Sequence, residues 1–388
     1  MKKIIAKKLI LLALLLVFGG LGGIVADRYL FPYLSATKTF SQYAFLKKGS
    51  ENITVINKTE QVTVKEETSI SKITNQVSSS IVNIVSYPDG EVKNVALKRS
   101  SAPKVATKNG TGIIVTGDGL IMTYAASINL ADTKYKVMTY DGNVYDATLS
   151  GVDSYSNLAF LKINANNLSV ASLSDSDSVK AGEKVIAVTN SFSSYANKYA
   201  SGLISDFNPS YNLAGLALSS SEKLEGVFET DFSQQQYFIG GPVVDYSGQI
   251  VGISGVIEKD NVQSFFLIPS NKMRAVIDRA VKKELDASAS LGIYYKPISK
   301  TYAIENNSDI EAGALIYSAS GQQGLAILNN SPAQKAGLKL GDIITAIDGK
   351  KISIENSLSD LLYAYKKGDR IELTFLRDEQ SNQTWVGL

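Results

Sequence analysis

Between residues 70 and 269 the chain is a succession of short strand patterns separated by turn signals, with little helical periodicity. One pair of strand patterns, 112–116 and 120–124, flanks Gly117-Asp118-Gly119, and a second pair flanks Asp141-Gly142. Glycine readily takes the positive φ that a tight turn needs, so both pairs are predicted to be β-hairpins. Many short strands joined by regular turns predict a mainly β barrel or sandwich.

From about residue 287 to the end the pattern becomes α+β. Ser331-Pro332-Ala333 opens a short helix with proline in its first turn, and Gly337 marks the end of that helix. A second helix is indicated by apolar side chains at i, i+3, i+4 and i+7, which place one helix face against a core. These side chains are Leu358, Leu361, Leu362 and Tyr365.

Four lysines among the first eight residues precede an uninterrupted apolar run from Leu9 to Ala26. At about 1.5 Å per residue the run spans roughly 27 Å, close to the thickness of a bilayer core. The lysines predict the N-terminus inside and the body outside the cytoplasmic membrane, as in a single-pass protein. A cleaved signal peptide is the alternative, but the run is longer than the usual apolar core and Val25-Ala26-Asp27 is a poor cleavage site.

The chain length of 388 residues leaves room for two or three domains. The patterns together divide the chain into five predicted parts. These are a cytoplasmic basic segment (1–8), a transmembrane anchor (9–26), a tether (27–69), a β-rich domain (70–286) and an α+β domain (287–388).

Two residue types are missing altogether, because the chain has no cysteine and no histidine. Without cysteine there are no disulfides, no thiol nucleophile and no thiolate metal site. Without histidine there is no imidazole ligand, and no Ser-His-Asp triad can be built from this chain alone. We therefore expect no cofactor and no metal. The net charge of +2 gives no electrostatic reason to expect nucleic acid as a partner.

Four blocks in this order resemble the HtrA/Deg family of trypsin-like serine proteases. They are 110–123, 153–163, 230–244 and 330–350. The last block, with Ser331-Pro332-Ala333 and Gly341-Asp342, is very similar to a bacterial PDZ domain. The resemblance implies a trypsin-like double β-barrel followed by an α+β PDZ domain, with one N-terminal transmembrane helix. It also implies a homo-oligomer, and a trimer by family resemblance.

The catalytic positions depart from the family pattern. Ala126 stands where the family has its histidine, Asn157 where it has its aspartate, and Ile239 where it has its nucleophilic serine. Tyr237 replaces a glycine that helps to form the oxyanion hole. Alanine cannot accept a proton, asparagine carries no charge and isoleucine has no hydroxyl. These substitutions predict no catalytic residues and a pseudoprotease, so that the chain is not expected to be an enzyme.

Four apolar or aromatic side chains would then surround the former site, and two alternatives follow for them. They are Ala126, Tyr237, Phe238 and Ile239. A packed cleft that only adds stability is one alternative, because clustered apolar side chains usually form core. A hydrophobic groove that binds a peptide without cutting it is the other.

The C-terminal domain carries the predicted binding function. PDZ domains add a peptide C-terminus as a strand at a sheet edge. Leu291, Gly292, Ile293 and Tyr294 resemble the loop whose backbone N–H groups receive the carboxylate. The groove wall is predicted from Leu358, Leu361 and Leu362, which are otherwise the inner face of a packed helix.

The leading hypothesis is a membrane-anchored HtrA-like adaptor, sensor or quality-control protein that binds peptide or protein C-termini. One alternative is an active endopeptidase with a non-standard site, or with a site completed by a partner chain. The other is an oligomeric scaffold whose PDZ domain binds nothing.

Overall fold

The computed structural model describes residues 2–30, 33–34, 70–88, 107–131, 133–191, 196–259 and 262–388. The chain separates into two compact units, Met1–Lys72 and Ile73–Leu388. Most of the predicted tether, residues 27–69, lies outside the described residues.

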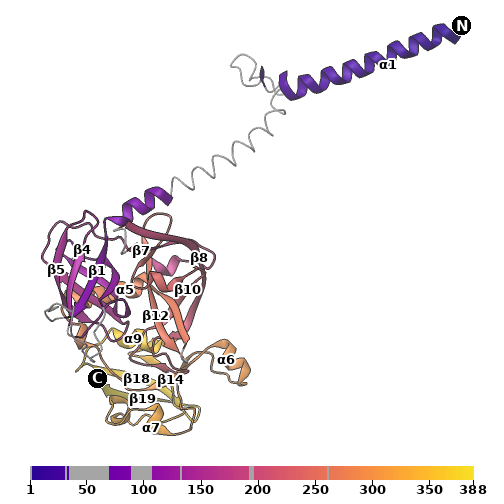
Figure 1. The fold of residues 1–388 in the computed structure, drawn as a ribbon. Helices are drawn as coiled ribbons and strands as arrows, with labels where there is room; N and C mark the ends of the chain where they lie inside the picture. Colours follow the sequence, from indigo (N-terminus) through magenta and orange to yellow (C-terminus); the bar gives the residue numbers. More distant parts are fainter. Residues whose placement is uncertain are drawn as a thin grey trace, which may run out of the picture. The chain divides into compact units, whose positions relative to one another are not determined.

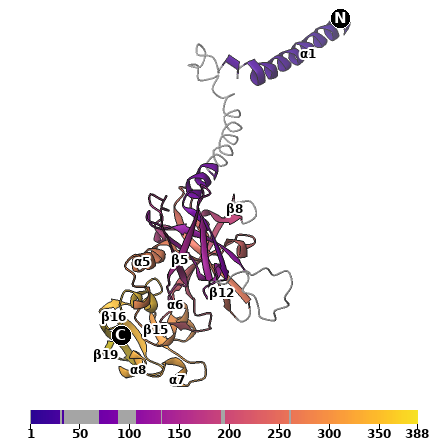
Figure 2. The same cartoon turned by 60° about the vertical axis from the view of Figure 1, so that its left-hand side comes forward.

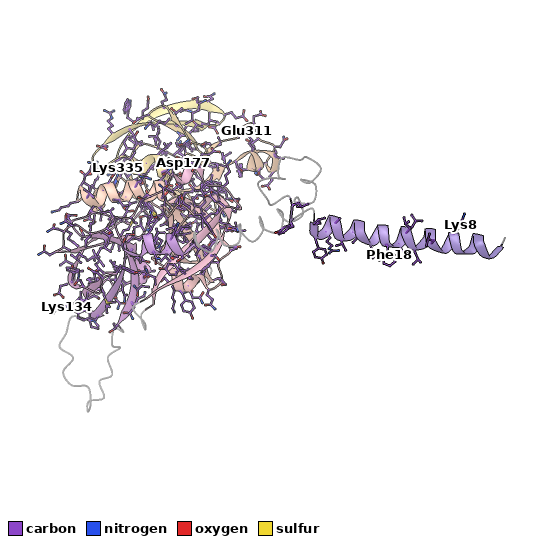
Figure 3. The ribbon with its side chains drawn as sticks, turned by 90° about the horizontal axis from the view of Figure 1, so that it is seen from above. Lys8, Phe18, Lys134, Asp177, Glu311 and Lys335 are labelled. Atoms are coloured by element: carbon purple, nitrogen blue, oxygen red, sulfur yellow. The ribbon has the colours of Figure 1, made fainter. Side chains whose placement is uncertain are left out.

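The first unit contains the helix α1 (Lys2–Val25), which continues into a turn of π-helix, η1 (Ala26–Leu30). Figure 3 shows the side chains of Lys8 and Phe18 on this helix. Within the described ranges, no helix meets the length and apolarity that crossing a membrane requires. The predicted transmembrane anchor at residues 9–26 is therefore not confirmed.

The second unit begins with a closed six-stranded barrel in which the strand order is β1-β2-β3-β6-β5-β4. Its strands are β1 (Ile81–Pro88), β2 (Lys108–Ile114), β3 (Leu120–Tyr124), β4 (Thr133–Met138), β5 (Val144–Val152) and β6 (Leu158–Ile163). Both predicted hairpins are confirmed, because β2 pairs with β3 and β4 pairs with β5 in antiparallel register. Gly119 has φ 97° in the first turn, the conformation that favours glycine.

A second closed barrel follows, with the strand order β10-β13-β12-β11-β7-β8. Its strands are β7 (Lys184–Ser191), β8 (Ala196–Asn212), β10 (Glu225–Thr230), β11 (Pro242–Val244), β12 (Ile250–Lys259) and β13 (Val262–Pro269). Each barrel has its own apolar core. The helix α5 (Ser270–Val281) and the 3-10 turn η5 (Leu285–Ala287) lead out of the second barrel.

The C-terminal domain is built on a third sheet with four short helices. Its strands are β14 (Tyr294–Ile298), β15 (Gly313–Ile316), β16 (Ile343–Ile347), β17 (Lys350–Lys351), β18 (Arg370–Arg377) and β19 (Gln380–Gly387). The helices are α6 (Lys300–Glu305), α7 (Gln323–Ala326), α8 (Pro332–Lys335) and α9 (Leu358–Tyr363). Ser331 caps α8 by accepting from the Gln334 N–H, as the Ser-Pro pattern predicts.

One strand of this third sheet comes from elsewhere in the chain. The sheet order is β19-β18-β16-β15-β14-β9, and β9 (Ser219–Ser220) lies between β8 and β10 of the second barrel. Ser220 pairs with Tyr294 and Ser219 with Tyr295, in antiparallel register. The edge of β14 is therefore already covered by a strand. Figures 1 and 2 show the C-terminal domain against one end of the barrel pair.

The core of the first barrel gives a test of this fold. Leu161 on β6 is fully buried in that core, whereas Leu130 is 46% exposed. We expect Leu161→Ala to lower the free energy of unfolding by about 2–5 kcal/mol, because the substitution leaves a cavity. Leu130→Ala is expected to change it by about 0.5 kcal/mol or less. Urea unfolding of the full chain measures both, and equal effects would contradict the placement of Leu161.

Candidate functional site

Three elements carry the positions at which the family resemblance expects catalytic side chains. Ala126 lies in the 3-10 turn η2 (Ala125–Ser127), directly after β3. Asn157 directly precedes β6, and Ile239 follows the 3-10 turn η4 (Gln235–Phe238). Ala126 from the first barrel and Ile239 from the second line one cavity of about 290 Å³. Asn157 is not among the residues that line this cavity.

The cavity is open, and polar and apolar groups share its lining. Tyr237 is 60% exposed at its wall, whereas Phe238 packs in the core of the second barrel beside Phe232. The polar residues and backbone that line it come from both barrels: Asn83, Lys108, Asn109, Gly110, Thr111, Ser127, Thr189, Asn190, Lys198 and Gln236. Of the four side chains, only Phe238 lies in a core, whereas Ala126 and Tyr237 are exposed and Ile239 is half-buried. This distribution does not favour the alternative of a packed apolar cleft.

The two barrels meet closely around Ser127. The Ser127 hydroxyl donates to the Tyr124 carbonyl at 2.8 Å. Gly240 of the second barrel lies against it, with φ 79°, and a Cβ at this position would come within 2.8 Å of the Ser127 Oγ. The Thr111 and Thr189 hydroxyl oxygens bridge the barrels at 2.8 Å. A side chain larger than glycine at residue 240 would force the barrels apart.

Two lysines give the cavity its charge. The Lys108 ammonium donates to the Ala126 carbonyl, and burial lowers the pKa of Lys108 from its usual value. The Lys198 Nζ lies 5.9 Å from the centre of the Tyr237 ring. Ammonium groups beside amide and hydroxyl side chains can hold carbonyl or carboxylate oxygens of a peptide. No sequence pattern marks either lysine, since each stands alone on its strand.

Asn157 lies beside the turn η2, because its backbone carbonyl accepts from the Ala125 N–H at 2.9 Å. Its backbone is left-handed, with φ 59°. Its amide donates to the Tyr124 hydroxyl at 3.4 Å, and its carbonyl accepts from the Lys223 Nζ at 3.3 Å. Burial, the largest cause, raises the pKa of Tyr124 to about 12, so this hydroxyl stays protonated at neutral pH.

The segment that was predicted to form the carboxylate loop leads into β14. Gly292 has φ 76°, and a Cβ there would come within 2.4 Å of the Ser331 Cβ, so only glycine fits. The side chains of Leu291 and Ile293 are buried in the domain core, and Tyr294 is half-buried. The apolar side chains therefore hold the loop in place, and the Leu291 and Gly292 N–H groups donate to Glu222.

The predicted groove wall lies on α9 beside this loop. Leu358 and Leu362 are fully buried in the domain core, and Leu361 is partly buried against it. Two of the three leucines therefore lie in the domain core, in agreement with the alternative that they form the inner face of a packed helix. The helix also faces the barrels, since the Tyr363 and Tyr155 rings stack with centroids 4.1 Å apart.

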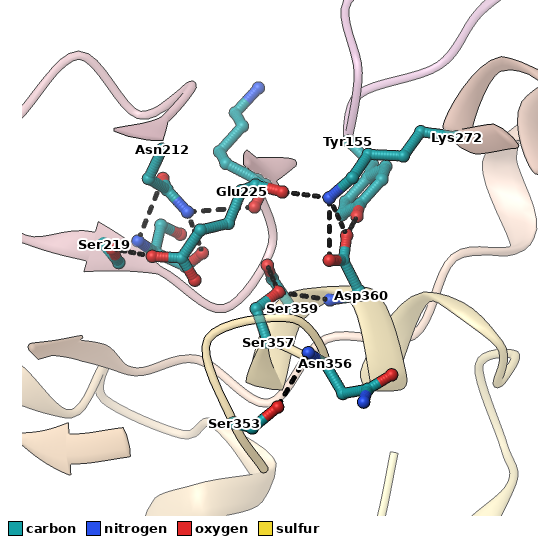
Figure 4. A network of polar contacts seen from close by, with 12 residues as sticks. Tyr155, Asn212, Ser219, Glu225, Lys272, Ser353, Asn356, Ser357, Ser359 and Asp360 are labelled. Atoms are coloured by element: carbon teal, nitrogen blue, oxygen red, sulfur yellow. Dashed lines mark hydrogen bonds and ion pairs between the residues drawn. The ribbon is translucent and has the colours of Figure 1, made fainter. Parts of the chain in front are cut away.

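A buried polar network joins β14 and α9 to the second barrel. Glu225 is 1% exposed, and its carboxylate accepts from the Ser219 hydroxyl at 2.6 Å and from the Tyr295 hydroxyl. Lys272 forms an ion pair with Asp360 at 2.7 Å (Figure 4). Burial, the largest cause, raises the pKa of Glu225 to about 7.

Metal binding has no support in the part of the chain that the structure describes. No group of three or more Asp or Glu side chains there could hold an ion.

Comparisons with known proteins assign a family model to part of the barrel region and another to the C-terminal domain. Residues 110–253 match the family model of a trypsin-like peptidase domain, and residues 290–388 match that of a PDZ domain. The predicted double barrel followed by an α+β PDZ domain is thereby confirmed.

The similar curated proteins are bacterial. "Periplasmic serine endoprotease DegP" of Escherichia coli (strain K12) is 30% identical over 274 residues, which are 69% of this chain and 54% of that protein. "Probable periplasmic serine endoprotease DegP-like" of Brucella suis biovar 1 (strain 1330) is 28% identical over 279 residues, which are 71% of this chain and 51% of that protein. The chain thus spans about half the length of the relatives it matches.

Solved structures show the same fold. "HtrA-type protease AlgW with decapeptide" superposes with a TM-score of 0.60 at 21% identity, covering 82% of this chain and 97% of the other. "HtrA-type protease AlgW with tripeptide" gives a TM-score of 0.63 at the same identity, covering 82% and 95%. At this identity the likeness speaks for the fold alone.

The prediction that the chain is not an enzyme is wrong. The relatives are named serine endoproteases, and those names point to a protease. The prediction rested on the side chains at three positions, Ala126, Asn157 and Ile239. Other groups share the cavity that Ala126 and Ile239 line, so these three side chains do not decide its chemistry.

Glu225 makes the contact between the C-terminal domain and the second barrel depend on pH. Its folded pKa of about 7 lies above the ordinary 4.5, so the folded state holds the proton more tightly. This contribution to stability is complete below about pH 4.5 and is lost as the pH rises through about 7. Asp360 and Lys272 face the same network and set its remaining charge.

The wild type is expected to lose on the order of 3 kcal/mol of unfolding free energy between about pH 5 and pH 8, and we expect Glu225→Gln to remove this loss. Urea unfolding at several pH values measures the slope, and Glu258→Gln, an exposed carboxylate on β12, is the control. Identical slopes for the wild type and Glu225→Gln would contradict the burial of Glu225.

Proposed function

We propose that this chain, an HtrA/Deg family member with a trypsin-like peptidase domain and a PDZ domain, binds the C-terminal segments of peptides or proteins through the PDZ domain. In this proposal the peptidase domain covers residues 70–286 and the PDZ domain residues 287–388. The protein would act on exposed chain ends as an adaptor, sensor or quality-control protein.

The observation that carries the proposal is the state of the β14 edge. This edge already pairs with an antiparallel strand, β9, which comes from outside the PDZ domain, and this pairing supports the addition of a peptide strand at the same place. The loop of Leu291, Gly292 and Ile293 stands at the start of β14, where a peptide added in the same sense would end. An added strand and a carboxylate-binding loop are the two parts of PDZ recognition.

The surroundings of the protein follow from its relatives. These are named periplasmic, so we propose an extracytoplasmic location for the body of this chain. A homo-oligomer, with a trimer as the first candidate, follows from the family resemblance and is tested by sedimentation of the full chain.

A second candidate function is an endopeptidase with a non-standard site, or with a site completed by a partner chain. The names of the relatives favour it. The cavity between the barrels supports it with a serine, Ser127, and a lysine of lowered pKa, Lys108. Hydrolysis of unfolded casein by the full chain tests this candidate. Cleavage in proportion to protein concentration supports it, and no cleavage by any oligomeric form contradicts it.

Peptide recognition gives a direct prediction. We expect the full chain to bind a subset of decapeptides on an array with free C-termini, and to lose that binding when the same peptides are amidated. Hydrogen bonds from N–H groups to a charged carboxylate contribute about 1.5–3 kcal/mol, so amidation is expected to weaken binding by roughly 10- to 100-fold. Equal binding to both arrays would contradict recognition of the C-terminus, and no enriched sequence would favour the scaffold alternative.

A further inference from the structure

The carboxylate loop of the PDZ domain is occupied by a carboxylate from the peptidase part of the chain. Glu222 Oε1 accepts hydrogen bonds from the Gly292 N–H at 2.8 Å and from the Leu291 N–H at 3.0 Å. The Ser221 and Ser290 hydroxyls donate to the same oxygen at 2.7 and 3.3 Å. The N–H groups that would receive a peptide carboxylate are thus already engaged.

The residues before Glu222 run along the groove as a peptide would. Ser219 and Ser220 pair with β14 in antiparallel register. The Ser221 N–H then donates to the Ile293 carbonyl at 3.1 Å, and its Oγ accepts from the Ile293 N–H at 3.2 Å. Residues 219–222, here called the inserted segment, therefore combine strand pairing with a carboxylate at the loop.

We infer that the inserted segment is an internal ligand of the PDZ domain, with the Glu222 side chain standing in for a C-terminal carboxylate. A peptide C-terminus must displace Glu222 before it can bind, because two carboxylates cannot share the same two N–H groups. The expected competition between Glu222 and a peptide C-terminus rests on the proposed function. The contact between Glu222 and the loop rests only on the geometry of residues 219–222.

Displacement of the Glu222 carboxylate leaves the neighbouring contacts of the chain in place. Directly after Glu222, the Lys223 Nζ donates to the Ser154 carbonyl at 2.6 Å, and the Leu224 N–H donates to the Tyr155 carbonyl at 2.9 Å. These bonds anchor the chain to the first barrel and do not involve the PDZ domain. Ser219 and Ser220 are also held by the second barrel, through Glu225 and Asn212. The Glu222 side chain can therefore leave the loop while the residues on both sides of it stay anchored.

The groove also has room left for a ligand side chain. A cavity of about 100 Å³ adjoins Glu222, and its PDZ side combines the apolar Ala289, Leu362 and Tyr363 with Ser288, Ser290 and Ser359. The inserted segment contributes Ser221 and Glu222 to the lining, and these polar side chains leave the apolar part unfilled. A peptide whose last residue is apolar would bury that side chain here, which the internal ligand does not do.

The test compares Glu222→Gln with the wild-type full chain on the array of free-carboxylate decapeptides and on its amidated copy. Glutamine keeps the size of the side chain but removes its charge, which weakens the internal contact. We expect the same free-carboxylate peptides to bind about 10-fold more tightly to Glu222→Gln. Glu229→Gln is the matched control, since Glu229 is also partly buried and accepts from Asn208 within the second barrel. Unchanged affinity for Glu222→Gln would overturn the inference.

Amide hydrogen exchange separates this inference from the proposed function. We expect the Leu291 and Gly292 amides to exchange faster in Glu222→Gln than in the wild type and in Glu229→Gln, without any peptide. If no variant binds any peptide, the proposed function fails. The exchange rates alone then test whether Glu222 is an internal ligand of the loop. Unchanged exchange at both amides would overturn it, whereas faster exchange confined to these amides would support it.

Discussion

The segment from Ser219 to Glu225 is the contact on which the arrangement of the second unit depends. The N-terminal end of this segment forms β9, which pairs with the edge of the PDZ sheet. Its C-terminal end begins β10 of the second barrel. Its last residue, Glu225, buries a carboxyl group against Tyr295. Burying such a group is costly unless hydrogen bonds satisfy it, so this contact holds only when the PDZ domain and the barrel are aligned.

Much of the fold could be predicted from the sequence because its elements are local. The hairpin at Gly117-Asp118-Gly119 and the helix opened by Ser331-Pro332 are set by a few neighbouring residues, and both form as expected. The strand β9 could not be predicted in this way. Its two serines have no apolar alternation, and their partner strand lies about seventy residues further along the chain.

The candidate sites divide along the same line. The place of residues 291–294 was indicated by the family resemblance, and the close Ser331 side chain explains why residue 292 is a glycine. The positive charge of the cavity between the barrels could not be predicted, because Lys108 and Lys198 come from different barrels and neither stands in a motif. The contact of Glu222 with the carboxylate loop could not be predicted for a similar reason. A single glutamate among serines gives no local sign of a partner in another domain.

An internal ligand also decides which peptides can compete with it. If the Glu222 contact stabilises the closed groove by about 1.5–3 kcal/mol, the groove is open for roughly 1–10% of the time, and apparent affinities fall by the same factor. The strand β9 covers only 2 residues, whereas β14 has 5. A longer peptide can pair with the rest of β14 and fill the space beside Leu362, and each such contact is one that the inserted segment lacks. Competition therefore favours extended chain ends with an apolar last residue, which are typical of unfolded or truncated proteins and rare on folded ones.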